Sequence, residues 1–130
     1  MIKLYDLQRI THEHADEYKA AMARVIDSGW FLQGDETKQF EHDYARYIGT
    51  QHCVAVANGL DALYLILRAY KEMGVMADGD EIIVPANTYI ATILAITRNN
   101  LKPVLVEPTW HHLELDTDRV EQAITPRTRG

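Results

Sequence analysis

Apolar residues recur every three or four positions along much of the chain, a spacing that places them on one face of a helix. Five stretches show it: residues 18–26, 40–48, 60–70, 90–97 and, more weakly, 117–124. Glycine closes the first three stretches, Asn99-Asn100 closes the fourth, and Pro126 closes the fifth. Asp35 is the expected N-cap of the second helix, because its carboxylate can accept a hydrogen bond from a free N–H of the first turn. The pattern therefore predicts a chain rich in amphipathic helices.

Three short runs between these helices are rich in valine and isoleucine and do not alternate polar with apolar residues. They are His52–Ala57, Glu81–Val84 and Pro103–Glu107. Runs of this kind are typical of strands buried on both faces, as in a parallel sheet covered by helices. We therefore predict an α/β fold, with N-terminal helices over about residues 1–50 and the start of an α/β sandwich over about residues 51–130.

Composition excludes several classes of protein. The length of 130 residues allows one domain at most, and the net charge of −6 with no cluster among thirteen Lys and Arg residues argues against nucleic-acid binding. No apolar run reaches the roughly 18 residues of a membrane span, so no membrane association is expected. The single cysteine, Cys53, cannot form an internal disulfide and fits a reducing compartment, so the expected location is the cytoplasm.

The first candidate site is the turn Asn58-Gly59-Leu60-Asp61, where an apolar run passes directly into a helix. The N–H groups of Gly59, Leu60 and Asp61 would point out of the helix start, where a phosphate can bind. An ordinary strand-to-helix turn that uses glycine for its geometry is the more frequent case on spacing alone. The glycine patterns of the Walker loop and of dinucleotide-binding folds are both absent.

Tyr89 is the second candidate, because Asn87-Thr88-Tyr89 follows a predicted strand at the end where α/β folds bind ligands. Its ring could cover a flat cofactor, although an aromatic packed between helix and sheet is the commoner arrangement. A phosphate turn together with an aromatic lid suggests a phosphorylated planar cofactor.

The remaining motifs give weaker indications. His12-Glu13-His14 and His111-His112 lack the spacing of a helical zinc site, so we expect exposed loop histidines and no metal, and we expect Cys53 to pack within a strand. Ser28–Gly34 carries Trp30 and Phe31 between two glycines. This loop could anchor onto the chain's own core or reach a partner subunit, and the sequence does not separate the two.

Taken together, four motifs in order resemble the nucleotide-sugar aminotransferases of the DegT type, which use pyridoxal 5′-phosphate (PLP). The motifs are Ser28–Gly34, Val56–Leu63, Gly79–Thr92 and Ala123–Thr128. The resemblance covers essentially the whole chain. It implies the N-terminal part of a three-layer α/β/α PLP-transferase large domain, with a mostly parallel sheet that is incomplete in this chain.

The resemblance also assigns roles to the candidate residues. It implies that the backbone amides of Gly59 and Leu60 hold the PLP phosphate and that the Tyr89 ring covers the pyridine face. Leu60 departs from the Thr or Ser of many members, which removes a hydroxyl contact but keeps the backbone donor. The pairing of Asn58–Leu63 with Asn87–Ala91 looks most like members that aminate C3 of a dTDP-linked keto-sugar.

The family's Schiff-base lysine and pyridine-binding aspartate lie beyond the position that matches Gly130. None of the lysines of this chain sits in a matching context; they are Lys3, Lys19, Lys38, Lys71 and Lys102. The resemblance therefore implies no catalytic residue here and a fragment that is inactive alone. The full enzyme would take a nucleotide-diphosphate keto-sugar and an amino donor, as a homodimer or by pairing with the missing remainder.

Two alternatives remain open at this point. One is a non-catalytic product of a truncated or split gene that pairs with another chain or binds PLP weakly. The other is an unrelated small phosphate-binding α/β domain.

The family's sheet order has a further consequence for the run His52–Ala57. In that order its sheet neighbours come from the missing part, so its backbone groups would be unpaired, at a few kcal/mol for each group that is buried. We therefore expect a fragment that is unstable, re-paired or oligomeric in isolation.

Overall fold

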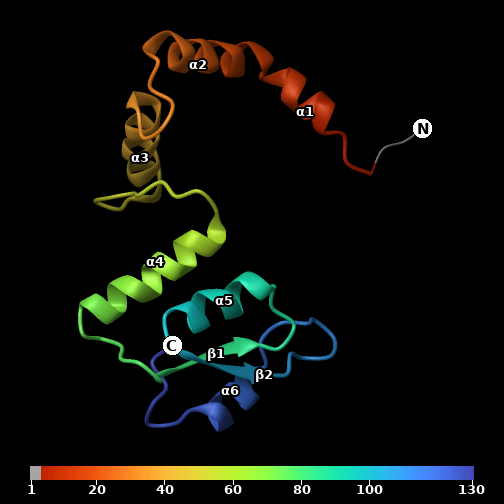
Figure 1. The fold of residues 1–130 in the computed structure, drawn as a ribbon. Helices are drawn as coiled ribbons and strands as arrows, with labels where there is room; N and C mark the ends of the chain where they lie inside the picture. Colours follow the sequence, from red (N-terminus) through yellow and green to blue (C-terminus); the bar gives the residue numbers. More distant parts are fainter. Residues whose placement is uncertain (1–3) are drawn as a thin grey trace. The chain divides into compact units, whose positions relative to one another are not determined.

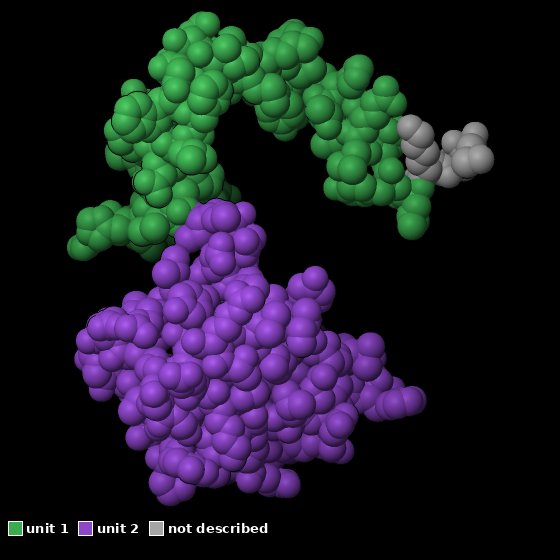
Figure 2. Space-filling model, viewed as in Figure 1, with its two compact units in different colours: residues 1–55 green, residues 56–130 purple. Residues whose placement is uncertain are grey.

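The computed structural model describes residues 4–130 and divides into two compact units, residues 1–55 and residues 56–130 (Figure 2). Lys3 lies outside the described residues. The elements in chain order (Figure 1) are α1 (Leu7–Glu13), α2 (Ala15–Ser28), α3 (Asp35–Ile48), α4 (Gly59–Glu72), β1 (Glu81–Pro85), α5 (Ile90–Arg98), β2 (Lys102–Val106) and α6 (Thr117–Ala123). The five predicted helices are therefore confirmed as α2 to α6, whereas α1 was not predicted. In the described part of the chain, no helix is long and apolar enough to cross a membrane.

The first unit consists of α1, α2 and α3, and its apolar side chains are largely exposed. Ala45 is its only buried residue among those that the structure describes. The predicted N-cap of α3 was wrong by one position: Gly34 is the N-cap and Asp35 is the first helical residue. Asp35 still stabilises the helix start, because a negative charge in the first turn complements the helix dipole.

The second unit contains the sheet and the main core. β1 and β2 pair in parallel from Glu81 opposite Lys102 to Pro85 opposite Val106, as the two runs predicted. The expected burial on both faces is wrong for β2, which starts one residue earlier than predicted and leaves Leu105 58% exposed. α4 packs against α5, and α5 and α6 both contact β2. Figure 1 shows α5 above the two strands and α6 below them. The buried core of this unit is formed by Met76, Ile82, Val84, Ile96 and Leu101.

The predicted strand His52–Ala57 is not a strand, and this prediction was wrong. Over residues 4–130 the only sheet is the pair β1–β2, so the segment has no neighbour with which to form a ladder. The carboxylate of Glu41 accepts the N–H of Ala55 at 2.7 Å, and the side chain of Val54 is largely exposed. The segment therefore lacks a sheet neighbour, as expected. Without such a neighbour an extended segment cannot form the ladder of hydrogen bonds that makes it a strand.

The free edge of β1 is covered by the last residues of the chain. The N–H of Glu81 donates to the carbonyl of Arg127 at 2.9 Å, and the N–H of Arg129 donates to the carbonyl of Glu81 at 2.9 Å. The N–H of Ile83 donates to the carbonyl of Gly130 at 2.8 Å. β1 therefore has hydrogen-bonded neighbours on both sides.

Candidate functional site

The turn before α4 presents two unpaired backbone donors. Asn58 is the N-cap, and its side-chain oxygen accepts the N–H of Asp61 at 3.0 Å. The N–H of Asp61 is thus not free to bind a ligand, contrary to the expectation that the N–H groups of Gly59, Leu60 and Asp61 all point outward. Among the residues that the structure describes, the N–H groups of Gly59 and Leu60 have no hydrogen-bond partner. These two donors lie at the positive end of the α4 dipole, where an anion is stabilised.

The space around Gly59 is open. A Cβ placed on this residue would meet no atom within 4 Å, and its φ does not lie in the left-handed region. Glycine is therefore required neither by the backbone conformation nor by the packing of the chain itself. A group held by the two amides could approach the backbone closely here, which a side chain would hinder. The turn fits a phosphate.

Tyr89 lies at the start of α5 and is 79% exposed. It follows directly on the turn after β1, where the N–H of Thr88 donates to the carbonyl of Pro85 at 3.1 Å. The hydroxyls of Thr88 and Thr92 are 2.9 Å apart and tie this turn to the first turn of α5. The alternative of a ring packed between helix and sheet is therefore wrong for this chain, and the ring is free to cover a ligand.

Gly59, Leu60 and Tyr89 all belong to the second unit, in which α4 packs against α5. The two helix starts follow the segment His52–Ala57 and the strand β1, respectively. A phosphate donor pair and an exposed aromatic ring are thus carried by two helices that contact each other.

The buried charge of this unit lies at the other end of the sheet. Glu81, the first residue of β1, is only 2% exposed. Its carboxylate accepts from the hydroxyl of Thr125 at 2.6 Å and from Lys102 and Arg127, each at 3.1 Å. The Thr125 hydrogen bond, followed by those cations, lowers the pKa of Glu81 below its usual value. This cluster joins β1, β2 and the C-terminal segment at the amino ends of the strands, away from the carboxyl ends where Tyr89 follows.

Lys71 and Asn99 form a second polar cluster, which sequence reasoning missed. The ammonium of Lys71 donates to the carbonyl of Asn99 at 2.7 Å and pairs with Asp78, whose pKa it lowers. The buried amide of Asn99 donates to the carbonyls of Tyr64 and Ala95 at 3.0 and 2.9 Å. Lys71 is thus held in the last turn of α4, at the opposite end of that helix from Gly59.

The loop between α2 and α3 leaves its aromatic side chains in solvent. Trp30 and Phe31 are both more than two-thirds exposed, so within its own unit the loop does not anchor onto a core. Together with the start of α3 it lines a hollow of about 500 Å³. Arg24 of α2 and Glu36 of α3 join the two helices beside it, with a bond of 2.9 Å from the guanidinium to the carboxylate.

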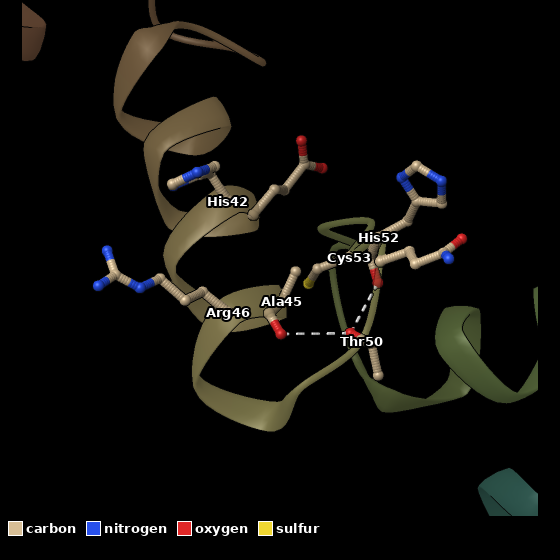
Figure 3. A pocket seen from close by; sticks show the side chains of 8 residues that line it. His42, Ala45, Arg46, Thr50, His52 and Cys53 are labelled. Carbon is tan, nitrogen blue, oxygen red and sulfur yellow. Dashed lines mark hydrogen bonds between the residues drawn. The ribbon is translucent and has the colours of Figure 1, made fainter.

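A further hollow of about 410 Å³ lies at the end of α3 (Figure 3). Cys53 lines it as a half-buried residue of an extended segment, so the expected packing within a strand was wrong. Figure 3 shows Cys53 facing Ala45, with Thr50 bonded to the carbonyls of Ala45 and His52. Histidines 42 and 52 and Glu41 also line it, but over residues 4–130 no three such side chains are placed to hold a metal ion.

The histidine motifs of the sequence lie on the surface. His12 belongs to α1 and His14 is the N-cap of α2. The expectation that these two histidines lie in a loop was therefore wrong. His111 and His112 lie in the exposed turn between β2 and α6.

Comparison with known proteins gives a consistent result along the chain. The sequence profile of the DegT/DnrJ/EryC1/StrS aminotransferase family matches residues 12–130. The dTDP-3-amino-3,6-dideoxy-alpha-D-galactopyranose transaminase of Aneurinibacillus thermoaerophilus is 49% identical over 130 residues, which are all of this chain and 35% of that enzyme. The dTDP-3-amino-3,4,6-trideoxy-alpha-D-glucose transaminase of Streptomyces venezuelae is 47% identical over 99% of this chain and 33% of the enzyme. The chain thus spans about a third of the length of the curated relatives it matches.

Solved structures agree with these relatives. The crystal structure of Streptomyces venezuelae DesV matches 98% of this chain and 33% of its own, with a TM-score of 0.84 and 46% identity. A sugar aminotransferase of Streptococcus pneumoniae, solved in its PLP form, matches 82% of this chain and 26% of its own, with a TM-score of 0.73 and 38% identity. The mixed α/β structure with its small parallel sheet therefore corresponds to part of a PLP aminotransferase.

Proposed function

The chain belongs to the DegT/DnrJ/EryC1/StrS aminotransferase family, and we propose that it supplies one part of a PLP site in an enzyme that aminates a nucleotide-linked keto-sugar. In this proposal the amides of Gly59 and Leu60 bind the cofactor's phosphate, and the ring of Tyr89 covers its pyridine face. Bound PLP supplies the electron-withdrawing ring on which amino transfer depends. The residues of this chain bind and orient that ring, and they neither donate nor accept a proton in the reaction.

One observation carries the proposal: α4 begins with two unpaired N–H donors at a glycine that the fold itself does not require. Backbone donors at a helix start suit a phosphate because their geometry is fixed and the dipole adds to each bond. Leu60 stands where many family members have Thr or Ser, and the loss of that hydroxyl leaves both backbone donors in place. The exposed ring of Tyr89, on the helix that α4 contacts, supports a planar group attached to that phosphate.

The relatives guide the choice of substrate. Two of them are named as transaminases of dTDP-linked 3-amino sugars, and at nearly half identity they support C3 of a dTDP-linked keto-sugar as the aminated position. We further propose a homodimer, or pairing of this chain with the part that it lacks relative to those enzymes. The loop that carries Trp30 and Phe31 is the candidate contact, since its rings are exposed. The cytoplasm stays the predicted location.

The chain alone is proposed to be inactive. Lys71 is engaged with Asp78 and Asn99 at the far end of α4 from the proposed phosphate turn, so it is badly placed to reach PLP. A non-catalytic product that binds another chain or PLP weakly stays the alternative, whereas an unrelated small phosphate-binding domain is excluded by the family match.

The test is an amide NMR titration of the 130-residue chain with pyridoxamine 5′-phosphate, which cannot attach to lysines at random because it has no aldehyde. We expect the largest shifts at the amides of Gly59 and Leu60, with ring-current shifts near Tyr89. Pyridoxamine without the phosphate is the matched ligand control. Gly59→Ala is the matched protein control: it should fold, since a Cβ meets nothing within 4 Å, and should lose the response.

A second measurement tests the inactivity. The chain is mixed with PLP, reduced with borohydride and analysed by mass spectrometry. No stoichiometric adduct at one lysine is expected. A single labelled lysine would show that the chain builds a complete attachment site, and the assignment of a partial site would then be abandoned.

A further inference from the structure

The segment between β2 and α6 is a closed turn rather than an open loop. Leu113 donates its N–H to the carbonyl of Thr109 at 2.9 Å, and Thr109 donates its N–H to the carbonyl of Glu114 at 2.9 Å. Pro108 and Leu115 form an antiparallel bridge at its base. We call residues 108–115 the tryptophan hairpin, after Trp110 near its tip. These backbone contacts within the segment give it a fixed shape.

The tryptophan hairpin is joined to the turn that carries Tyr89. β1 and β2 are parallel and end in register, with Pro85 opposite Val106, so the turn and the hairpin leave the same edge of the sheet. Figure 1 shows both segments starting at the arrowheads of the two strands. The side-chain amide of Asn87 donates to the carbonyl of Leu113 at 3.0 Å and bridges them. The hairpin is therefore positioned from the residue that lies two places before Tyr89.

The tip of the hairpin carries a large aromatic ring that the fold does not use. Trp110 is 88% exposed, and the neighbouring His111 and His112 are exposed as well. An indole left in water at the ligand-binding edge of an α/β sheet offers a flat face for stacking. A planar partner gives the largest contact with such a face, and the planar group of a nucleotide-linked sugar is its base.

The charge of the segment decides which end of a nucleotide it can take. Residues 103–118 contain no lysine or arginine, whereas Glu107 directly precedes the hairpin and Glu114 lies within it. Carboxylates without a neighbouring cation repel a diphosphate. The hairpin is therefore suited to the neutral base and unsuited to the phosphates.

We propose that Trp110 is the stacking platform for the nucleobase of the nucleotide-linked substrate, and that Asn87 is the positioning residue that holds the platform beside Tyr89. This inference rests on the proposed function, since it assumes a nucleotide-linked substrate at this edge. Stacking on an aromatic side chain tolerates any base, so the hairpin contributes affinity for the nucleoside and does not select the sugar.

The chain offers a matched pair of probes, because Trp30 and Trp110 are its only tryptophans. Trp30→Phe leaves Trp110 as the sole indole, and Trp110→Phe leaves Trp30. We expect thymidine 5′-diphosphate at millimolar concentration to quench the fluorescence of the Trp30→Phe protein and to leave that of the Trp110→Phe protein unchanged. Deoxyribose 5-phosphate, which lacks the base, should quench neither.

Affinity is then measured by NMR titration of the same chain. Trp110→Ala should weaken binding of thymidine 5′-diphosphate by roughly 5- to 150-fold, the range for loss of one base–aromatic stack. Asn87→Ala should weaken it less and should sharpen the amide signals of residues 109–114, because the hairpin loses its link to the turn. Gln39→Ala, which removes an exposed side-chain amide of α3 in the other unit, is the control for Asn87→Ala and should leave the affinity unchanged.

The outcomes separate this inference from the proposed function. If pyridoxamine 5′-phosphate shifts Gly59 and Leu60 while the nucleotide does not bind, or binds with an affinity that Trp110→Ala leaves unchanged, the platform is wrong and the cofactor site stands. If the nucleotide quenches Trp110 while the cofactor leaves Gly59 and Leu60 unaffected, the platform is supported and the cofactor site is wrong. Quenching of Trp30 instead of Trp110 also overturns the inference.

Discussion

The two units contain helices of similar length and similar amphipathic pattern, yet they differ in what those helices bury. In the first unit α2 and α3 have 14 residues each, and only Ala45 is buried among its described residues. In the second unit α4 also has 14 residues and no fully buried residue of its own, but it packs against α5, whose Ile96 belongs to a buried core together with Ile82 of β1. An apolar helix face therefore shows that the helix needs a packing partner, but it does not show that the chain itself supplies one.

The difference has an energetic meaning. An isolated helix of this length is marginal in water, and most helical stability in proteins comes from burying the apolar face. Within the apolar stripes of the first unit, the side chains of Met22, Ile26 and Tyr47 are each more than half exposed. We therefore expect the second unit to hold most of the stability of the chain, and the following substitutions test that expectation.

Ile96→Ala should have the largest effect. Ile96 is 1% exposed in the core of the second unit, so truncation should cost about 2–5 kcal/mol of unfolding free energy through lost burial and a cavity. The matched control is Ile26→Ala in α2, where the side chain is 65% exposed and the change should stay within about 0.5 kcal/mol. Urea unfolding followed by circular dichroism measures both. Equal effects of the two substitutions would contradict the comparison, and Ile96→Val, at about 0.5–1.5 kcal/mol, covers the case in which the alanine variant does not fold.

The pH dependence of stability should be carried by Glu81. Its pKa is lowered in the folded state by the Thr125 hydroxyl and then by the cations of Lys102 and Arg127. Its stabilising contribution is therefore fully present above its ordinary pKa of 4.5 and is lost as the pH falls through the lower, folded-state pKa. Melting temperatures from about pH 7 down to about pH 3 should fall more steeply for the unaltered chain than for Glu81→Gln.

A control from the first unit sharpens this result. Arg24 lowers the pKa of Glu36 by a similar hydrogen bond, but these side chains are 59% and 41% exposed, respectively, whereas that of Glu81 is buried. Exposed ion pairs contribute little to stability, so Glu36→Gln should leave the pH profile nearly unchanged. If Glu36→Gln reduces the pH dependence of the melting temperature and Glu81→Gln does not, the pH-sensitive charge lies in the first unit and its assignment to Glu81 is wrong.

Asn99→Ala should have an intermediate effect. The buried amide of Asn99 joins α5 to the carbonyl of Tyr64 in α4, and its loss should cost about 1–3 kcal/mol because the amide's two hydrogen bonds are broken. Gln39→Ala in α3 removes an amide that donates to Asp43 on an exposed surface, and it should cost less than about 0.5 kcal/mol. Urea unfolding distinguishes the two. Similar values would mean that burial does not set the strength of these bonds.

Local signals explain which parts of the fold could be predicted. The helices α2 to α6 follow from apolar spacing and from caps such as Gly49 and Asn99, and each of these signals lies within one segment. α1 was missed because its few apolar residues make no continuous stripe. His52–Ala57 was predicted as a strand from composition alone, but a strand needs a neighbour, and the neighbour is not a property of the segment.

In the candidate site too, the features set by adjacent residues could be predicted, whereas the contact between distant segments could not. Gly59 and Leu60 were found because a helix start is written in adjacent residues, and the engagement of Asp61 could also have been read from Asn58 as an N-cap three positions earlier. The contact between Asn87 and Leu113 joins residues 26 positions apart. Nothing in either segment indicates the other, so the link between the two loops required the structure.

Gly49→Ala should have the smallest effect, and it tests whether the first unit holds any stability of its own. Gly49 ends α3 with a φ of +82°, and a Cβ there would meet nothing within 4 Å, so the only cost is backbone strain of about 1 kcal/mol. A Cβ at Gly59 would likewise meet nothing within 4 Å, but the φ of Gly59 is not left-handed, so Gly59→Ala should cost less stability. Hydrogen exchange of the amides in the last turn of α3 measures the loss directly. Faster exchange there with Gly49→Ala means that α3 is formed and capped in solution, whereas exchange that is already unprotected before the substitution means that the first unit needs a partner even to keep its helices.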